Sequence, residues 1–398
     1  MQPSRSFRLL LNAAHTMDHL VLLVFASAVS SIALDFGLAR WEDLMPYTAG
    51  AFFMFGLGSI PAGRLGDLWS RRKAMLTFFF GTGASCLLVA LCQSPWQLAV
   101  ALTLLGSFAS IYHPVGIPML LRDAPRPGLA IGWNNLAGNL GIALAALITG
   151  FIVQWAGWRA AFIVPGLLTI ALGVAFSRVA REEPHSAAKA ASKRSEGAPT
   201  ISPMVKRALI VMTVAACVGS VLFNFTTNGN TELFRERMAM SLPDPVAIGA
   251  ALAALYSVAA FSQVIVGRLT ERFALRPLFM GIVAFQSVFL FLASQAEGWW
   301  FYAAALGFMA SIFGAIPFTD TIVVRYVDDA LRSRVTGMRI GIAFVVSSTA
   351  VGLLGPLVKS AGFAQSLVML AALSTLTLLA IWALPTRLES ARVAPIKS

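Results

Sequence analysis

Three of the four histidines in this 398-residue chain lie in two strongly apolar stretches. His15, Asp18 and His19 occupy positions i, i+3 and i+4, which share one face if their stretch is a helix. His113 follows Tyr112 in a later apolar stretch. A titratable group at membrane depth costs roughly 2.5–3.5 kcal/mol on insertion scales, so such a group is a functional-site candidate by default. These residues are therefore the first candidates for a site.

Two kinds of chemistry suit this group. Protons can move between imidazoles and a carboxylate, and Asp18 is our first choice as acceptor because no Lys or Arg is near it in sequence. Alternatively, the three histidines and Asp18 would supply the four ligands of a metal site. The spacing His-x-x-Asp-His matches no specific metal signature, so we assign no metal and no cofactor. A plainer alternative is that His15 and His19 are hydrated gate or packing residues near the membrane interface.

The composition excludes a soluble globular protein. Hydrophobic residues make up 58% of the chain and charged residues only 12%, whereas soluble domains have about 25% charged residues. The formal charge of +12 does not form a basic face, because the charges lie in the gaps between apolar runs. We therefore expect a bilayer, and no nucleic acid, as partner. Motifs for ATP binding or hydrolysis are absent from the sequence, so we predict that the chain is not an enzyme.

Apolar runs of about 20 residues predict an all-α polytopic protein with twelve transmembrane helices. Lys and Arg gather in alternate loops, which places both termini in the cytoplasm and the chain in the cytoplasmic (inner) membrane. The expected domains are an N-terminal six-helix bundle (1–178), a cytoplasmic linker (179–206) and a C-terminal six-helix bundle with a short tail (207–398). The predicted spans are 7–34, 44–65, 74–92, 96–121, 129–153, 159–178, 207–231, 246–267, 278–295, 299–324, 335–358 and 364–384.

One charged, glycine-bearing turn occurs twice. Residues 63–73 read Gly-Arg-Leu-Gly-Asp-Leu-Trp-Ser-Arg-Arg-Lys, and residues 267–276 read Gly-Arg-Leu-Thr-Glu-Arg-Phe-Ala-Leu-Arg. The displacement is 267 − 63 = 204 residues, about half the chain, so the two halves are repeats. This pattern resembles the cytoplasmic signature between the second and third helices of the major facilitator superfamily.

The resemblance implies two pseudo-symmetric six-helix bundles with a substrate site between them, exposed alternately to each side of the membrane. It also implies a conformational gate in the repeated turns. Asp67 is expected to meet the amino end of helix 11 near Ser333 and Arg334, and Glu271 the amino end of helix 5 near Gly128. The predicted gate residues are Gly63, Asp67, Arg71, Arg72, Gly267, Arg268, Glu271 and Arg272.

In this superfamily, helices 1, 4, 7 and 10 line the cavity, so their polar residues are candidates for binding. Helix 7 is rich in amides and hydroxyls, and we expect it to break near Gly229 and to form a hydrogen-bonding wall. Packing is an alternative role for the amides of helix 5, and a structural salt bridge for the acid of helix 10. The predicted substrate and proton pathway comprises His15, Asp18, His19, Tyr112, His113, Asn139, Asn224, Asn228, Glu232 and Asp320.

A closer resemblance concerns the first half. Residues 108–114, Phe-Ala-Ser-Ile-Tyr-His-Pro, and 138–141, Gly-Asn-Leu-Gly, are similar to segments of the fosmidomycin-resistance type of efflux carrier. We predict a monomeric secondary transporter that moves a small organic solute by alternating access, coupled to protons, with export slightly favoured. The alternatives are a carrier of a transition metal or metal chelate, and an importer of a small organic anion.

Overall fold

The computed structural model describes residues 5–122, 124–180, 203–326 and 329–384. Within these ranges the chain is helical and has no β-strand. The side chains of some helical residues, among them Asp67 and Asp320, lie outside the description. The first half contains α1 (Arg5–Asp35), the short 3-10 helices η1 (Trp41–Asp43) and η2 (Met45–Thr48), α2 (Ala49–Leu68), α3 (Arg71–Leu91), α4 (Pro95–Ala109), α5 (Tyr112–Leu121) and α6 (Pro127–Val179). The second half contains α8 (Pro203–Arg237), α9 (Pro245–Arg272), α10 (Leu275–Gln295), α11 (Gly298–Tyr326) and α12 (Asp329–Trp382).

Two of these helices are divided by a glycine. Gly157 in α6 has φ 80° and ψ 168°, and Gly362 in α12 has φ 77° and ψ 168°. A residue with a side chain rarely adopts these angles, whereas glycine adopts them readily. Each glycine thus turns the chain from one span to the next without a loop, and the two turns are 362 − 157 = 205 residues apart. The repeat predicted from the sequence is therefore present in the backbone.

The fourth span bends in its middle. α4 ends at Ala109 and α5 begins at Tyr112, while the two residues between them keep right-handed helical angles. Pro114 explains the bend, because proline has no N–H to donate to the carbonyl four residues earlier, which belongs to Ser110. With α4 and α5 as one span and the glycine turns dividing α6 and α12, the described helices agree with the predicted twelve. Nine described segments, two of them containing these glycine turns, are long and apolar enough to cross a membrane.

One sequence expectation about helix 7 is wrong. α8 is continuous from Pro203 to Arg237, with no break at Gly229. Several of its polar side chains bond to the preceding turn of the same helix; for example, the Thr227 hydroxyl donates to the Phe223 carbonyl at 2.7 Å. Such bonds to the preceding turn satisfy hydroxyl groups without unwinding the helix. The predicted linker, 179–206, lies mostly outside the described residues, so its boundaries remain a prediction.

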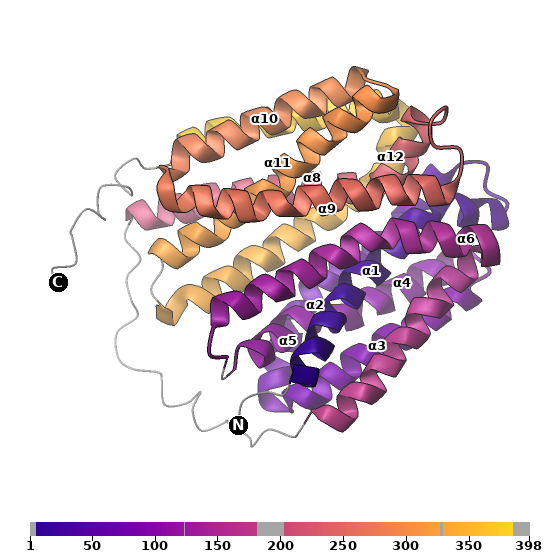
Figure 1. The fold of residues 1–398 in the computed structure, drawn as a ribbon, viewed down its shortest axis with the longest axis horizontal. Coiled ribbons are helices and arrows are strands. Elements are labelled where there is room, and N and C mark those ends of the chain that lie inside the picture. Colours follow the sequence, from indigo (N-terminus) through magenta and orange to yellow (C-terminus); the bar gives the residue numbers. More distant parts are fainter. Residues whose placement is uncertain (1–4, 123, 181–202, 327–328, 385–398) are drawn as a thin grey trace.

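The two halves form two groups of helices in Figure 1, indigo to magenta for the first and red to yellow for the second. They meet along α2 with α12 and along α6 with α9, while α1 and α8 face each other more loosely between these pairs. We call the end of the molecule near residues 68–71, 179, 203, 326 and 329 the terminal end. The opposite end, near residues 35–49, 157, 237–245 and 362, is the distal end.

The apolar core shows where the halves are joined. Toward the distal end, a single cluster of buried side chains draws on both halves, including Val29, Phe162, Phe234 and Leu252. Toward the terminal end, each half has its own cluster, around Phe79 in the first half and around Phe279 in the second. The halves therefore share a core at the distal end and have separate cores at the terminal end.

Candidate functional site

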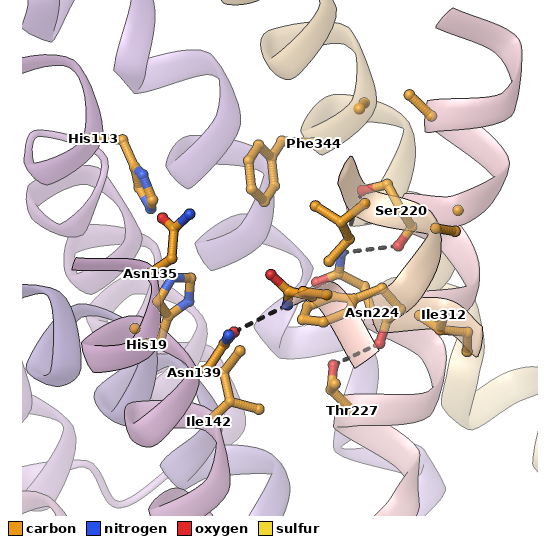
Figure 2. Close-up of a pocket in the computed structure, with 18 of the residues that line it drawn as sticks. His19, His113, Asn135, Asn139, Ile142, Ser220, Asn224, Thr227, Ile312 and Phe344 are labelled. Carbon is orange, nitrogen blue, oxygen red and sulfur yellow. Dashed lines mark hydrogen bonds between the residues drawn. The ribbon is translucent and has the colours of Figure 1, made fainter. Parts of the chain in front are cut away.

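A cavity of about 350 Å³ lies between the two halves. Its lining comes from α1, α2, α5 and α6 on one side and from α8, α9, α10, α11 and α12 on the other. Figure 2 shows His19, His113 and Asn139 on the side of the first half, facing Ser220, Asn224 and Thr227 of α8. Apolar and aromatic side chains make up the greater part of the wall. The cavity thus has the position, between repeats, at which alternating access requires a site.

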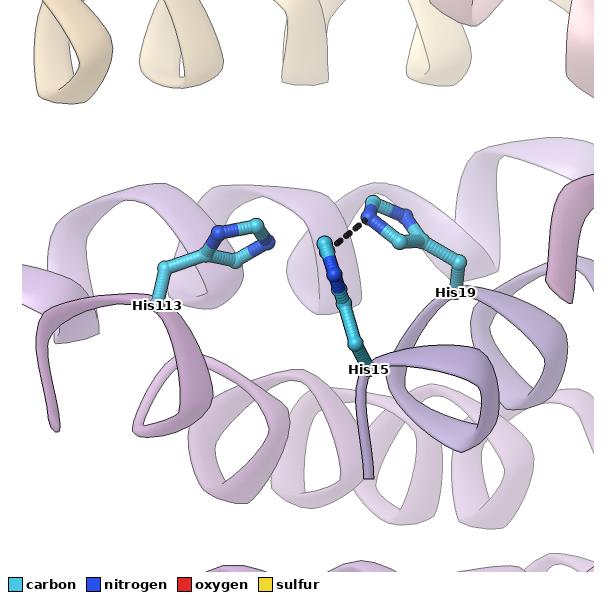
Figure 3. A group of neighbouring side chains, drawn as sticks. All are labelled: His15, His19 and His113. Carbon is cyan, nitrogen blue, oxygen red and sulfur yellow. Dashed lines mark hydrogen bonds between the residues drawn. The ribbon is translucent and has the colours of Figure 1, made fainter. Parts of the chain in front are cut away.

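Three imidazole rings stand together in this wall (Figure 3). The Nε2 atoms of His15 and His19 are 3.1 Å apart, as expected for residues one helical turn apart. The His15 ring centroid is 5.0 Å from that of His113, and His19 is 5.6 Å from His113. One ring nitrogen from each histidine lies within 4.8 Å of the others. The structure therefore brings together the histidines of α1 and α5.

Asp18 lies behind this cluster and is completely buried. Its Oδ2 atom is 3.4 Å from Nε2 of His113. Neither carboxylate oxygen has a hydrogen bond among the described residues. A buried carboxylate without hydrogen bonds is costly unless a positive charge or a proton offsets it. The carboxylate and the three rings thus form one electrostatic unit.

His15 is fixed by its neighbours on α5 and α6. Its Nδ1 donates to the backbone carbonyl of Asn134 at 2.7 Å, which leaves Nε2 to face His19. Its ring stacks on Tyr112 at a centroid distance of 4.8 Å. A Cβ at Gly138 would come within 2.6 Å of the His15 ring, so this glycine is needed for the approach of α6 to α1. Burial and these contacts hold the ring in one orientation.

Tyr112 supports the cluster and does not line the cavity. Its hydroxyl donates to the Leu11 carbonyl at 3.0 Å and accepts from the Asn134 amide at 2.7 Å. The same amide donates to Oδ1 of Asn12 at 3.0 Å. This buried network links α1, α5 and α6 at the level of the histidines.

The predicted amides divide into two groups. Asn139 and Asn224 line the cavity. Asn139 also reaches the other half, where the Gln263 amide approaches its Oδ1 at 3.5 Å (Figure 2). Asn228 is outside the cavity lining, and its amide donates to the Asn224 carbonyl within α8. The polar part of the α8 wall is therefore formed by Ser220, Asn224 and Thr227, and Asn228 packs behind it.

Glu232 is not part of the cavity lining and lies toward the distal end of α8. It is 5% exposed and accepts from Arg235 at 2.7 Å through each of its oxygens. Ser30 of α1 donates to the same carboxylate at 2.8 Å, so this contact joins the two halves. Lys359 and Asp43 form an ion pair that also joins the halves at this end. The side chain of Asp320, also predicted for the pathway, lies outside the described residues.

The predicted gate residues are found at the terminal end, where several can be described. Arg72 donates to the carbonyls of Ser177 and Ala180, at 2.8 and 2.7 Å, and so caps the end of α6 within its own half. Gly63 lies near Pro114, whereas a Cβ at Gly267 would meet nothing within 4 Å. Among the predicted gate residues that the structure describes, the side chains of Arg268, Glu271 and Arg272 are exposed and that of Arg71 is half-buried. The expected partners of Asp67 and Glu271 involve side chains outside the description.

Several cavity residues were not predicted. Gln263 in α9 and Arg339 in α12 line the cavity, and both are polar residues inside apolar spans, which is a signal that could have identified them. Phe52, Phe55 and Phe344 also line it, and the Phe55 and Phe344 rings meet edge to face at 5.0 Å. The chain contains 28 phenylalanines, so nothing in the sequence distinguishes these three.

The model of the Major Facilitator Superfamily matches residues 11–258 of this chain, which is more than half of it. The chain therefore belongs to the Major Facilitator Superfamily, and the resemblance found in the repeated turns is confirmed. It is a multi-pass membrane protein. The similarity to the fosmidomycin-resistance type remains a prediction.

Curated relatives match a limited part of the chain. The chain is 26% identical over 164 residues to the "Probable hexose phosphate transport protein" of Chlamydia pneumoniae, covering 41% of this chain and 36% of the relative. It is 28% identical over 182 residues to the "Tetracenomycin C resistance and export protein" of Streptomyces glaucescens, covering 41% and 34%. The chain thus spans about a third of the length of these relatives. Both names are those of transporters, the class of protein that the sequence predicted.

Solved structures extend the similarity of fold to nearly the whole chain. A bacterial homolog of the human lysosomal transporter Spinster has a TM-score of 0.77 at 15% identity, covering 97% of this chain and 98% of its own. The xylose transporter XylE from E. coli has a TM-score of 0.75 at 14% identity, covering 95% of each chain. At these identities the comparison concerns the fold, and the predicted twelve-helix fold is confirmed.

Proposed function

We propose that this protein is a secondary transporter that carries a small organic solute through the central cavity by alternating access. The observation that carries the proposal is the cavity itself. It lies between two repeated halves and is lined by both. Binding at such a position couples occupancy to the relative arrangement of the halves. The chemistry of the wall, aromatic on several sides with amides on α6, α8 and α9, suits a partly apolar solute with hydrogen-bonding groups.

The arrangement in this structure supports an alternating mechanism. α6 and α9 are in backbone contact near the distal end, where Gly150 meets Pro245 and Gly249 meets Ala146. Toward the terminal end of the same two helices, a Cβ at Gly132 or Gly267 would meet nothing within 4 Å. With the termini in the cytoplasm, as the distribution of Lys and Arg predicts, this is an inward-facing arrangement. Transport then requires a second arrangement in which the distal contacts open.

Proton coupling and a preference for export are part of this proposal. Their support is the grouping of the predicted pathway residues His15, Asp18, His19 and His113 beside the cavity. The relatives named above include an export protein, which agrees with this direction. The cytoplasmic membrane and a monomeric state are proposed with it.

The test begins with purified protein and a thermal-shift screen of drugs, sugar phosphates and organic anions, because a ligand selective for the folded state raises the melting temperature. A ligand found in this way is then labelled and loaded into proteoliposomes with a pH gradient. We expect gradient-driven flux that a protonophore abolishes, together with counterflow exchange that it leaves intact. Flux that is insensitive to the protonophore would overturn proton coupling, and binding without any flux would overturn transport.

A further inference from the structure

We infer that His15, His19 and His113 form a binding site for a divalent transition-metal ion in the wall of the central cavity. The inference deepens the proposed function, on which it rests for its role in transport, by naming a class of cargo: a metal ion or a small organic solute that carries one. The three rings come from two helices and line the same cavity (Figure 3).

The distances fit an ion of this class. Nitrogen ligands of a tetrahedral zinc ion lie about 2.0–2.1 Å from the metal, so two of them are about 3.3 Å apart. The Nε2 atoms of His15 and His19 are hydrogen-bonded at 3.1 Å. A metal ion in place of the proton between them would be bound by both atoms with little movement. His113 has a nitrogen within 4.8 Å of the others, and its side chain is 31% exposed, so its ring has room to turn inward.

The surroundings of His15 are those of a metal ligand. A ligating histidine usually donates its second ring N–H to a carbonyl or carboxylate, which fixes the ring and leaves the other nitrogen bare. His15 donates from Nδ1 to the Asn134 carbonyl at 2.7 Å, and its Nε2 faces the other rings. The buried Tyr112 ring and Gly138 hold the imidazole in this position.

Asp18 is an independent indication that a cation belongs here. It is completely buried, has no hydrogen bond among the described residues, and lies 3.4 Å from His113. A dication held by the three imidazoles would offset this negative charge at short range. The carboxylate would act through His113 as a positioning residue and a counter-charge, not as a ligand.

The ligand set selects the kind of metal. Imidazole suits zinc, copper, nickel and iron, whereas magnesium and calcium prefer oxygen ligands. Three protein ligands leave a fourth position open toward the cavity. Because the cavity of about 350 Å³ is far larger than an ion requires, a donor atom of an organic solute has room at that position.

The experiment uses the full chain, purified with a tag that contains no histidine and treated with a chelator. Cobalt(II) chloride alone is titrated in, and its visible absorption is recorded, since tetrahedral cobalt absorbs far more strongly than hydrated cobalt. We expect one equivalent to bind and zinc to displace it. Asp18→Asn removes a supporting residue and should weaken cobalt binding by roughly 10–100-fold. His19→Ala and His113→Ala each remove a ligand and should weaken binding by more than this. His185→Ala, which removes the remaining histidine of the chain, is the matched control and should bind like wild type.

Absence of saturable binding in the wild type would overturn the inference, and so would undiminished binding in both His19→Ala and His113→Ala. Size-exclusion profiles show whether these variants are folded. X-ray absorption of the zinc-loaded wild type needs no variant: it should show imidazole nitrogens at about 2.0 Å, and a shell of oxygen alone would contradict the site. These measurements need no membrane gradient, so their failure leaves the transport proposal standing, and a failure of flux leaves the metal site standing.

Discussion

The His15 ring is held on three sides, by the Asn134 carbonyl, the Tyr112 ring and the backbone of Gly138. A side chain held in this way loses little further freedom when it binds a ligand, so less of the interaction energy is lost to ordering. His113 has greater freedom, because its side chain is partly open to the cavity. At the residue scale, the cluster therefore combines one fixed ring with one ring that can adjust.

The contribution of the Tyr112 hydroxyl to the support of His15 can be tested with a substitution that keeps the aromatic ring. Tyr112→Phe leaves the stacked ring but removes a buried group that donates to the Leu11 carbonyl and accepts from Asn134. We expect the free energy of unfolding to fall by about 1–3 kcal/mol, because buried polar groups lose a partner. Thermal unfolding in detergent measures it. Tyr47→Phe is the control, since the Tyr47 hydroxyl has no hydrogen bond among the described residues; an equal loss in both variants would contradict the prediction.

The sequence could predict part of this site for a physical reason. The spacing of His15, Asp18 and His19 places them on one face of any helix, so their proximity depends on α1 alone. The sequence groups His113 with them as a candidate, but the contact itself depends on how α1 packs against α5. The Asn134 carbonyl could not be found in this way, because every residue has one and the packing of α6 selects it.

At the scale of the elements, α6 and α9 pack differently at their two ends. Near the distal end their backbones touch at glycines, and toward the terminal end the two helices diverge (Figure 1). The contact between Gly150 and Pro245 could not be predicted from the sequence, because it depends on how one half docks on the other. The bend between α4 and α5 could be expected from the sequence, because Pro114 has no N–H to donate to the preceding turn.

Gly150→Leu tests the distal contact. A larger side chain there would meet the Pro245 backbone, which cannot move aside as a flexible side chain can. We expect this arrangement to be destabilised by about 1–3 kcal/mol, as is usual for overpacking. Thermal unfolding in detergent is the measurement. The matched control is Gly132→Leu on the same helix, where a Cβ meets nothing within 4 Å. A Gly132 variant that is as unstable as the Gly150 variant would contradict this account.

At the scale of the whole molecule, the two halves share one core at the distal end and have separate cores at the terminal end. Two polar contacts, Ser30 with Glu232 and Asp43 with Lys359, lie where the cores merge. The repeat predicted from the sequence gives the two halves and a site between them. It cannot give their relative position, because a transporter of this kind must be stable in more than one arrangement.

Cross-linking the halves tests whether the distal contacts must open. In a background lacking Cys86, Cys92 and Cys217, we expect Asp43→Cys with Lys359→Cys, joined by a short bifunctional maleimide, to abolish flux in proteoliposomes. Ligand binding from the terminal end should remain. The control pair, Asp35→Cys with Arg159→Cys, replaces a 2.7 Å ion pair at the same end but within one half. Flux that persists after complete cross-linking of residues 43 and 359 would exclude alternating access through this interface.

The turns at Gly157 and Gly362 have a consequence for how the chain is made. Each joins two spans through a single residue with positive φ, so no aqueous loop separates the helices of the pair. During synthesis on the ribosome, no polar segment follows the first helix of such a pair that could cross the bilayer before the second helix is made. We therefore expect each pair to enter the membrane as one hairpin, and foreign epitopes inserted at residues 157 or 362 to block biogenesis.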